Sequence, residues 1–204
     1  MRFFILIVSF MSFFQLVEAQ MSVDSVFCNS KSKVLDLLCL NARMDLLDYF
    51  NSGVPMTVEN DFKEKSFLLE KSSKLLKLKI SNVSRCEILL LDEAAATPLY
   101  AVLHTIDSPI GYVRVEIRSN EENLVDSFSI KPQLGEVVDT SNLTNVEVNA
   151  FLSCGWVATF SEKDLSLCVK PAIENVKFKC KDGLIGKMKD LVYKWNGTSF
   201  VRVK

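Results

Sequence analysis

Residues 99–118, with the sequence LYAVLHTIDSPIGYVRVEIR, consist of two apolar segments joined by a turn. In the second segment, valine and isoleucine alternate with arginine and glutamate, which is the period of a strand with one buried and one exposed face. Aspartate, serine and proline at 107–109 are typical turn residues. The stretch therefore predicts an antiparallel β-hairpin with strands at Leu99–Ile106 and Gly111–Arg118.

Similar patterns on both sides of this hairpin predict further strands. Before it, Leu76–Ile80 and Cys86–Leu91 are separated by a polar break, and Thr57–Lys65 is a polar connection. After it, Trp156–Phe160 and Leu165–Val169 flank a polar turn and predict a second hairpin. Its expected facing pairs are Trp156 with Val169, Ala158 with Leu167, and Phe160 with Leu165.

The end of the chain predicts a third hairpin. Its arms are Leu191–Trp195 and Thr198–Val203, and Asn196-Gly197 lies between them. Because Asn-Gly accepts positive φ at both positions, it favours a two-residue turn. We therefore expect Tyr193 to lie opposite Phe200.

One segment has the period of a helix. From Ser30 to Phe50, apolar residues recur at helical spacing, and Gly53 and Pro55 follow as expected beyond a helix C-terminus. The polar residues 120–149 predict a long connection with one short strand at Asp126–Ile130. The expected fold class is α+β, with one N-terminal helix packed on a mostly antiparallel, hairpin-rich sheet. An all-β sandwich with one appended helix is the alternative.

Residues 1–20, MRFFILIVSFMSFFQLVEAQ, have the layout of a secretory signal peptide. Arg2 precedes an apolar run, and Ala19 supplies a small residue at the cleavage point. The alternative is an uncleaved anchor, but the run is shorter than the roughly 20 residues that a membrane-spanning helix needs. The sequence predicts a cleaved leader at 1–19, a single domain at 20–204 without a stable transmembrane segment, and a secreted or periplasmic location.

The charge of the chain argues against nucleic-acid binding. Lysine and arginine number 24 against 25 aspartate and glutamate, so the net charge is −1 and no basic excess faces a phosphate backbone. A local basic face is formed by Lys177, Lys179, Lys181, Lys187 and Lys189, and such lysines usually protect the edge of a sheet from pairing. No motif for a cofactor or a metal is present, so neither is expected.

The cysteines raise a redox question. The sequence has six of them: Cys28, Cys39, Cys86, Cys154, Cys168 and Cys180. Several lie on apolar stripes, where free cysteine behaves as a small buried hydrophobe, and no CxxC pair is present. We expect buried thiols, or at most one or two disulfides, with at least two thiols free.

The single histidine, His104, is the most obvious catalytic candidate. A hydrolase could use it as a general base with Ser108 as nucleophile and Asp107 beside them. No nucleophile elbow surrounds Ser108, however, and Pro109 lacks the backbone N–H that could stabilise an oxyanion. The sequence therefore favours a non-enzymatic binding or interaction module and assigns no catalytic, cofactor-binding or metal residue. A hydrolase with a site near His104, Asp107 and Ser108 is the alternative.

Several phrases of the sequence occur together in a known family. These are Ala42–Asp48, Thr57–Asn60, the pair His104-Thr105 followed by Asp107-Ser108, and the closing Leu191–Phe200. In this order they resemble a Bacteroidetes family of exported proteins of about this length and of unknown function. The resemblance implies a place in the bacterial envelope or outside the cell. It carries over no catalytic residue and no cofactor. Together with the signal-peptide layout and the lack of a catalytic motif, the sequence favours an unknown envelope or extracellular protein or glycan as partner.

Overall fold

The computed structural model of the chain describes residues 21–92, 97–107, 111–139, 141, 143–152, 155–172 and 188–203. Its larger sheet has seven strands in chain order, each antiparallel to the next: β1 (Val58–Glu59), β2 (Lys65–Lys71), β3 (Leu75–Lys79), β4 (Ser84–Asp92), β5 (Leu99–Ile106), β6 (Tyr112–Ser119) and β7 (Leu124–Ser129). Its smaller sheet has four, in the order β11-β10-β9-β8: β8 (Trp156–Ser161), β9 (Ser166–Pro171), β10 (Leu191–Trp195) and β11 (Phe200–Arg202). The described helices are α2 (Val23–Asn29), α3 (Leu40–Asn51), α4 (Leu134–Val137) and α5 (Asn145–Leu152).

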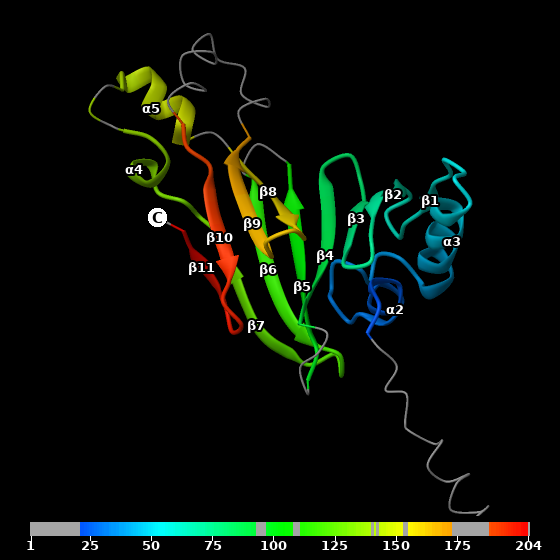
Figure 1. Ribbon diagram of the computed structural model, residues 1–204. Coiled ribbons are helices and arrows are strands. Elements are labelled where there is room, and N and C mark those ends of the chain that lie inside the picture. Colours follow the sequence, from blue (N-terminus) through cyan, green and yellow to red (C-terminus); the bar gives the residue numbers. More distant parts are fainter. Residues whose placement is uncertain are drawn as a thin grey trace, which may run out of the picture.

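The larger sheet lies between two covering layers (Figure 1). On one face, residues of β3–β6 such as Leu103 and Val115 pack against Phe160 and Leu167 of the smaller sheet. On the other face, residues of β3–β5 pack against α2, α3 and the turns between them. This arrangement confirms the sheet-rich α+β class. It also contains the two facing sheets on which the all-β alternative was based.

The hairpin predicted at residues 99–118 is confirmed. β5 and β6 pair along their whole length, from Leu99 opposite Ser119 to Ile106 opposite Tyr112. The valines and isoleucine of β6 are buried between the two sheets, as their alternation predicts.

The predicted helix over Ser30–Phe50 is wrong in its first half. The chain forms α2 before this range, then turns, and begins α3 only at Leu40. The physical reason is Arg43, whose buried guanidinium donates to the backbone carbonyls of Phe27, Cys28, Ser30, Leu35 and Leu38. These carbonyls all point toward the Arg43 guanidinium. In a continuous helix they would instead point along the helix axis to backbone N–H groups four residues later.

The hairpin between β8 and β9 has a register different from the predicted one. Trp156 lies opposite Pro171 and Phe160 opposite Leu167, so each partner is two positions farther along than expected. The cause is the turn, because Leu165 has a φ of 46° and belongs to the loop rather than to the strand. A shift of two positions keeps every side chain on its face, so the predicted buried face is still correct.

The closing hairpin also differs from its prediction. Trp195, not Tyr193, lies opposite Phe200, so the loop is longer than two residues. Asn196 organises this loop, since its Oδ1 accepts hydrogen bonds from the backbone N–H groups of Thr198 and Ser199. The asparagine side chain thus replaces the two-residue turn that Asn-Gly usually forms.

Several helices and strands lie in polar segments that were predicted to be connections. Within residues 120–149, where one strand was expected at Asp126–Ile130, the chain forms β7 at Leu124–Ser129 and then α4 and α5. β1 and the start of β2 likewise occupy the segment Thr57–Lys65, which was expected to be a connection. β7 and β1 lie at the two edges of the larger sheet, where fewer apolar residues are needed.

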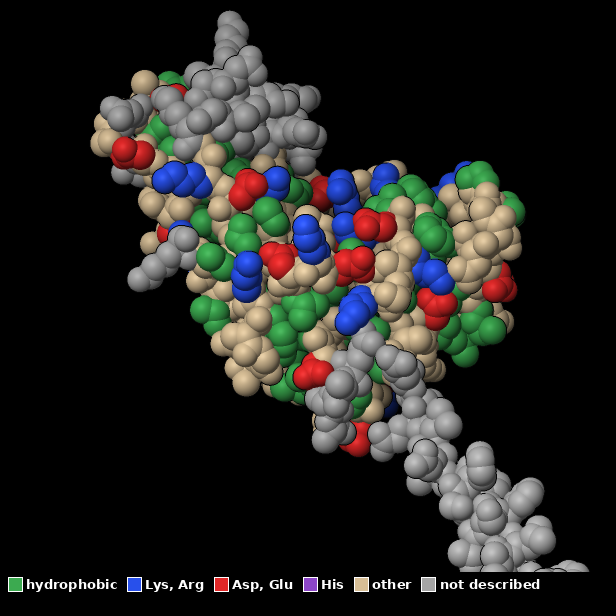
Figure 2. All heavy atoms as spheres, in the orientation of Figure 1, with side chains coloured by type: hydrophobic (Ala, Val, Ile, Leu, Met, Phe, Trp, Pro, Cys, Tyr) green, Lys and Arg blue, Asp and Glu red, His purple; other side chains and the backbone are tan. Residues whose placement is uncertain are grey.

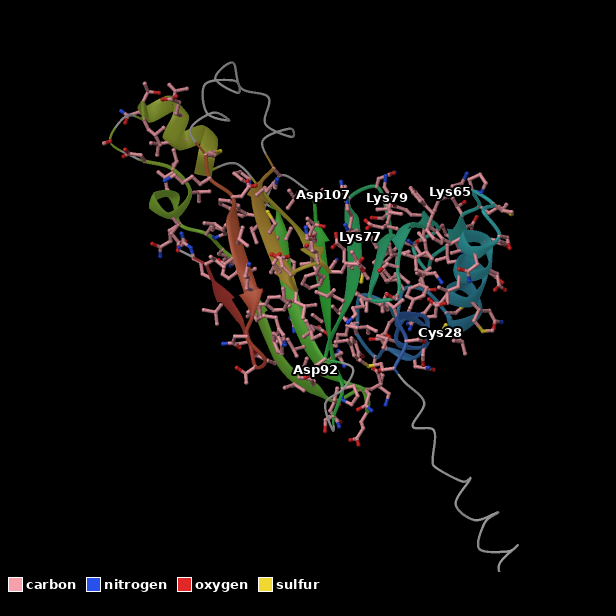
Figure 3. The ribbon with its side chains drawn as sticks, viewed as in Figure 1. Cys28, Lys65, Lys77, Lys79, Asp92 and Asp107 are labelled. Atoms are coloured by element: carbon pink, nitrogen blue, oxygen red, sulfur yellow. The ribbon has the colours of Figure 1, made fainter. Side chains whose placement is uncertain are left out.

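The four cysteines in the described part of the chain, Cys28, Cys39, Cys86 and Cys168, are free thiols. This confirms the expectation of at least two. Cys28 lies in α2 (Figure 3). The leader at 1–19, Cys154, Cys180, Ser108, and four lysines of the basic face, Lys177, Lys179, Lys181 and Lys187, lie outside the described residues.

Two contacts join the sheets closely. The carboxylate of Glu87 on β4 is buried and accepts hydrogen bonds from the Thr159 hydroxyl at 2.9 and 3.1 Å and from the Phe160 N–H at 2.7 Å. Burial raises the pKa of Glu87 to about 7, although the Phe160 N–H, Lys77 and Thr159 act to lower it. Gly111, with a φ of 38°, lies so close to β8 that an added Cβ would overlap the backbone of Gly155 and Trp156.

Charged side chains of both signs are interspersed on the face formed by the smaller sheet and the neighbouring strands (Figure 2). Ion pairs account for several of them: Lys77 with Glu70, Lys170 with Asp190, and Lys194 with Asp164. Among the helices that the structure describes, none is long and apolar enough to cross a membrane.

Candidate functional site

A groove lies on the helix-covered face of the larger sheet, where the helical layer ends. Among the described residues, the apolar side chains beneath the helices come from β1–β5, mainly from β3, β4 and β5, and none comes from β6. β6 instead presents a row of polar side chains to this face, and they form the groove floor. The groove has a volume of about 560 Å³. Its floor is Val102, His104, Tyr112, Arg114, Glu116 and Arg118, and its walls are Ser32, Lys33, Val34, Leu37, Phe62 and Leu124.

The centre of the floor is an ionic triad on one strand. Glu116 lies between two arginines: its Oε2 is 2.9 Å from Nε of Arg118, and its Oε1 is 3.5 Å from Nε of Arg114. The side chains of Glu116 and Arg118 are only 12% and 9% exposed, so all these charges except the outer part of Arg114 have lost most of their water. A buried ionic cluster contributes little net stability compared with apolar residues of the same size. Stability alone therefore does not account for this row.

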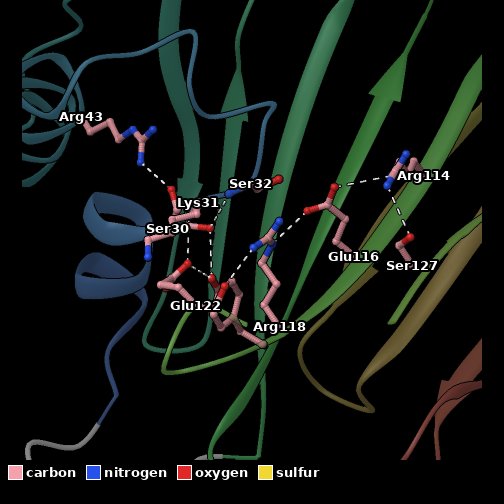
Figure 4. Close-up of polar contacts among 10 residues, drawn as sticks. Ser30, Lys31, Ser32, Arg43, Arg114, Glu116, Arg118, Glu122 and Ser127 are labelled. Carbon is pink, nitrogen blue, oxygen red and sulfur yellow. Dashed lines mark hydrogen bonds and ion pairs between the residues drawn. The ribbon is translucent and has the colours of Figure 1, made fainter. Parts of the chain in front are cut away.

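The triad continues into a hydrogen-bonded chain that reaches the helices (Figure 4). Nη1 of Arg118 donates to the backbone carbonyl of Glu122 at 3.2 Å. The Glu122 carboxylate accepts from the Tyr100 hydroxyl at 2.6 Å and from the Lys31 N–H at 2.8 Å. Ser30 Oγ lies 3.1 Å from the same tyrosine hydroxyl. Burial and the hydrogen bond to Glu122 raise the pKa of Tyr100, so the tyrosine hydroxyl keeps its proton at neutral pH.

His104 lies at the edge of this floor. Its Nε2 is 3.0 Å from Oγ of Ser84 on the neighbouring strand, and its ring packs edge-on against Tyr112. Burial, together with the charge of Arg114, lowers the pKa of His104, although Glu116 acts to raise it. The imidazole is therefore neutral at pH 7.

The structure does not bring His104 and Asp107 together. The Asp107 carboxylate, at the end of β5 (Figure 3), pairs with Arg85 at 2.8 Å, whereas the ring of His104 is bonded to Ser84. Ser108 lies outside the described residues. Of the two described residues of the hydrolase hypothesis, His104 lines the groove and Asp107 does not. Within the described part of the chain, no three His, Cys, Asp or Glu side chains are grouped as metal ligands would be.

One wall of the groove is an exposed aromatic ring on a turn whose backbone is held by hydrogen bonds. Phe62 is 70% exposed. Its turn is held by the buried Asn60, whose Oδ1 accepts from the N–H groups of Phe62 and Glu64 and whose Nδ2 donates to the Ile80 carbonyl at 2.7 Å. An exposed ring on a fixed turn is a typical contact for a ligand, because little entropy is lost when it is covered.

Sequence reasoning missed the arginines and Glu116 as site residues. The alternation of β6 assigned them to a solvent-exposed face, which is the usual place for charged residues in an antiparallel sheet. The only feature of the sequence that could have identified them as site residues is that three charged side chains share one face of a single strand. Their burial depends on segments 32–37 and 60–63, which are distant in the sequence.

These features define a class of protein: an α+β protein in which helices and a small sheet cover opposite faces of a seven-stranded antiparallel sheet, with a charged groove beside the helices. The chain belongs to the DUF3256 family, a family of proteins of unknown function, whose model matches residues 14–200. This match confirms the resemblance to a family without an established activity.

The fold is similar to that of a domain of an uncharacterized protein from Porphyromonas gingivalis W83, a member of the Bacteroidetes. The two share 16% sequence identity, the similarity covers 88% of this chain and 97% of that one, and the TM-score is 0.63. At this identity the likeness shows the fold alone. No curated protein matches the chain.

Proposed function

We propose that the protein is an exported, non-enzymatic binding module of the bacterial envelope and that the groove on β6 holds its ligand. The observation that carries the proposal is the row of buried charges in the groove floor. Pockets that bind ligands combine apolar walls with a few fixed polar groups, and their volumes fall in the range of this groove. The signal-peptide layout of residues 1–20 supports the location.

A hydrolase is the second candidate, and one contact favours it. Ser84 Oγ lies 3.0 Å from Nε2 of a neutral His104, which is the geometry of a hydroxyl beside a general base. Against it, no carboxylate among the described residues hydrogen-bonds the histidine ring. Turnover of ester, glycan or peptide substrates that is lost in His104→Ala would favour the hydrolase over the binding module.

Export is tested by fractionating the cells that make the protein and determining its N-terminus by mass spectrometry. We expect the chain in the periplasm or the medium, beginning at Gln20. A cytoplasmic chain that retains residues 1–19 would contradict this part of the proposal.

Binding at the groove is tested by the unfolding temperature of the purified protein with a panel of envelope glycans, peptides and lipids. A ligand at about 100 times its Kd stabilises the folded state by about 2.7 kcal/mol, which is easily measured. We expect at least one class to stabilise the wild type and Arg202→Met but not Arg118→Met. Arg202 is a matched control because it pairs with Glu136, away from the groove. Equal stabilisation of the two variants would exclude the groove as the site.

A further inference from the structure

The charges that line the groove are unbalanced. Lys33, Arg114 and Arg118 are positive and Glu116 is negative, whereas the whole chain carries a net charge of −1. Glu122 lies next to the triad and does not line the groove, and with its negative charge counted the cluster still has one net positive charge. The groove is therefore a local positive region on a nearly neutral protein, and it favours an anion.

The arginines also have hydrogen-bonding capacity to spare. Arg118 lines the groove and donates through Nε and Nη1, and no described residue accepts from its Nη2. Nε of Arg114 is buried without a hydrogen bond and meets Glu116 only as an ion contact at 3.5 Å. A guanidinium that is nearly buried and incompletely paired is a ready site for a carboxylate or phosphate oxygen.

The walls have the opposite character. Leu37, Phe62 and Leu124 stand around the charged floor, and Phe62 and Leu124 are 70% and 51% exposed. Exposed apolar groups beside a cationic floor suit a ligand that has an anionic head and an apolar body, because each part finds its match in the same groove.

We infer that the ligand of this groove is an anionic amphiphile, with a carboxylate or phosphate head at Arg118 and Arg114 and an apolar chain against Phe62. The inference rests on the proposed function, since it names the chemical class bound at the same site. The two arginines hold the head, Glu116 keeps both guanidinium planes in place, and the turn at Asn60 keeps the aromatic wall fixed.

The test is calorimetric titration of the purified protein with dodecanoate and dodecyl phosphate, with dodecanol as a neutral control and acetate as a control for the head alone. We expect dodecanoate or dodecyl phosphate to bind at least about tenfold more tightly than dodecanol, since a charge-assisted hydrogen bond is worth about that factor. Acetate should not bind measurably. The stronger of the two anionic probes distinguishes a carboxylate source from a phosphate source. Binding should weaken with salt, because the attraction is electrostatic.

Variants identify the contact. Arg118→Met should weaken the anionic probes at least about tenfold and leave dodecanol unchanged, because one charge-assisted contact to the head is lost. Phe62→Ser should weaken dodecanol and the anionic probes alike. Since Phe62 is exposed, Phe62→Ser should keep the fold of the wild type. It therefore still tests the site if Arg118→Met does not fold. Arg202→Met should behave as the wild type.

Two results would overturn the inference. One is equal binding of dodecanol and dodecanoate, and the other is unchanged affinity for both anionic probes in Arg118→Met. If the probes fail but a glycan or peptide stabilises the protein in a manner that depends on Arg118, the amphiphile is excluded and the proposed function stands. If no class of ligand depends on Arg118, both fail.

Discussion

Replacing Glu87 by glutamine tests how the two sheets are held together. Glu87 is 7% exposed, and its carboxylate bonds to Thr159 and Phe160 across the sheet interface. Lys77, Arg85 and Lys170 line the small cavity beside it, and Glu70 lies near enough to act on its pKa. Glutamine keeps the shape and an acceptor oxygen but has no charge to desolvate.

The magnitude follows from the pKa. Burial raises the pKa of Glu87 from 4.5 to about 7, so the folded state binds more protons than the unfolded state between these values. The contribution of Glu87 to the unfolding free energy is therefore highest below pH 4.5 and falls as the pH rises to 7. At about 1.4 kcal/mol for each pH unit, the carboxylate lowers stability by about 3 kcal/mol at pH 8. Glu87→Gln should lack this loss.

The assay is urea unfolding followed by tryptophan fluorescence at pH 4.5 and pH 8, with reductant present. We expect the two proteins to have similar stability at pH 4.5 and the variant to be more stable at pH 8 by about 2–3 kcal/mol. Glu121→Gln, in an exposed loop, is the control and should differ from the wild type at neither pH. A difference between Glu87→Gln and the wild type that is the same at both pH values would refute the reasoning.

Three further experiments test the packing. Arg43→Lys should lower the unfolding free energy by about 3 kcal/mol or more, because one ammonium cannot donate to all the carbonyls that the guanidinium holds and each unpaired buried acceptor costs about 1–3 kcal/mol. Urea unfolding checks this, and a variant as stable as the wild type would contradict it. Gly111→Ala should destabilise far more than Gly197→Ala in thermal unfolding, since both residues have positive φ, at a cost of about 1–2 kcal/mol to alanine, but only Gly111 lies against the backbone of β8. Equal losses would argue against that close approach. Cys86, fully buried and with a raised pKa, should react with a thiol reagent only after unfolding, whereas exposed Cys39 should react in the native protein. Mass spectrometry of the native protein checks this, and rapid labelling of Cys86 would show that the core is open.

The sequence predicts the strands of the fold well where one face is buried. The hairpin at 99–118 is confirmed because the apolar alternation of β6 and the turn residues point to the same structure. The hairpin registers differ because they depend on the geometry of single residues. Leu165 takes a positive φ, and the side chain of Asn196 enlarges its loop. Neither the φ of Leu165 nor the loop at Asn196 can be predicted from the apolar pattern.

The N-terminal helix shows a different limit. Apolar spacing across Ser30–Phe50 places Arg43 on a polar face, whereas the structure buries it among carbonyls from several turns. A periodic pattern records which residues are buried in a regular helix. The pattern does not indicate that the Arg43 side chain, rather than helical backbone N–H groups, donates to the carbonyls of this segment.

The candidate site could be predicted only in part, because it is formed by contacts between residues on different strands. His104 lines the groove, but its partner Ser84 comes from β4 and not from the turn that follows His104 in the chain. The arginines of β6 were placed on the correct face of their strand. Their burial could not be predicted, because it depends on where a layer formed by residues 21–51 ends over the sheet.

Every strand of the larger sheet pairs with its immediate predecessor along the chain. A chain that enters a compartment N-terminus first can therefore complete each hairpin as soon as the second strand emerges, because the contacts are local. The strands of the smaller sheet emerge much later. The hydrogen bond between Glu87 and Thr159, which joins the two sheets, links residues 72 positions apart. Until then one apolar face of β3–β6 is uncovered. A chain that emerges in this order is thus most prone to aggregate between the emergence of β6 and that of β8, and a chaperone that protects it should bind this face.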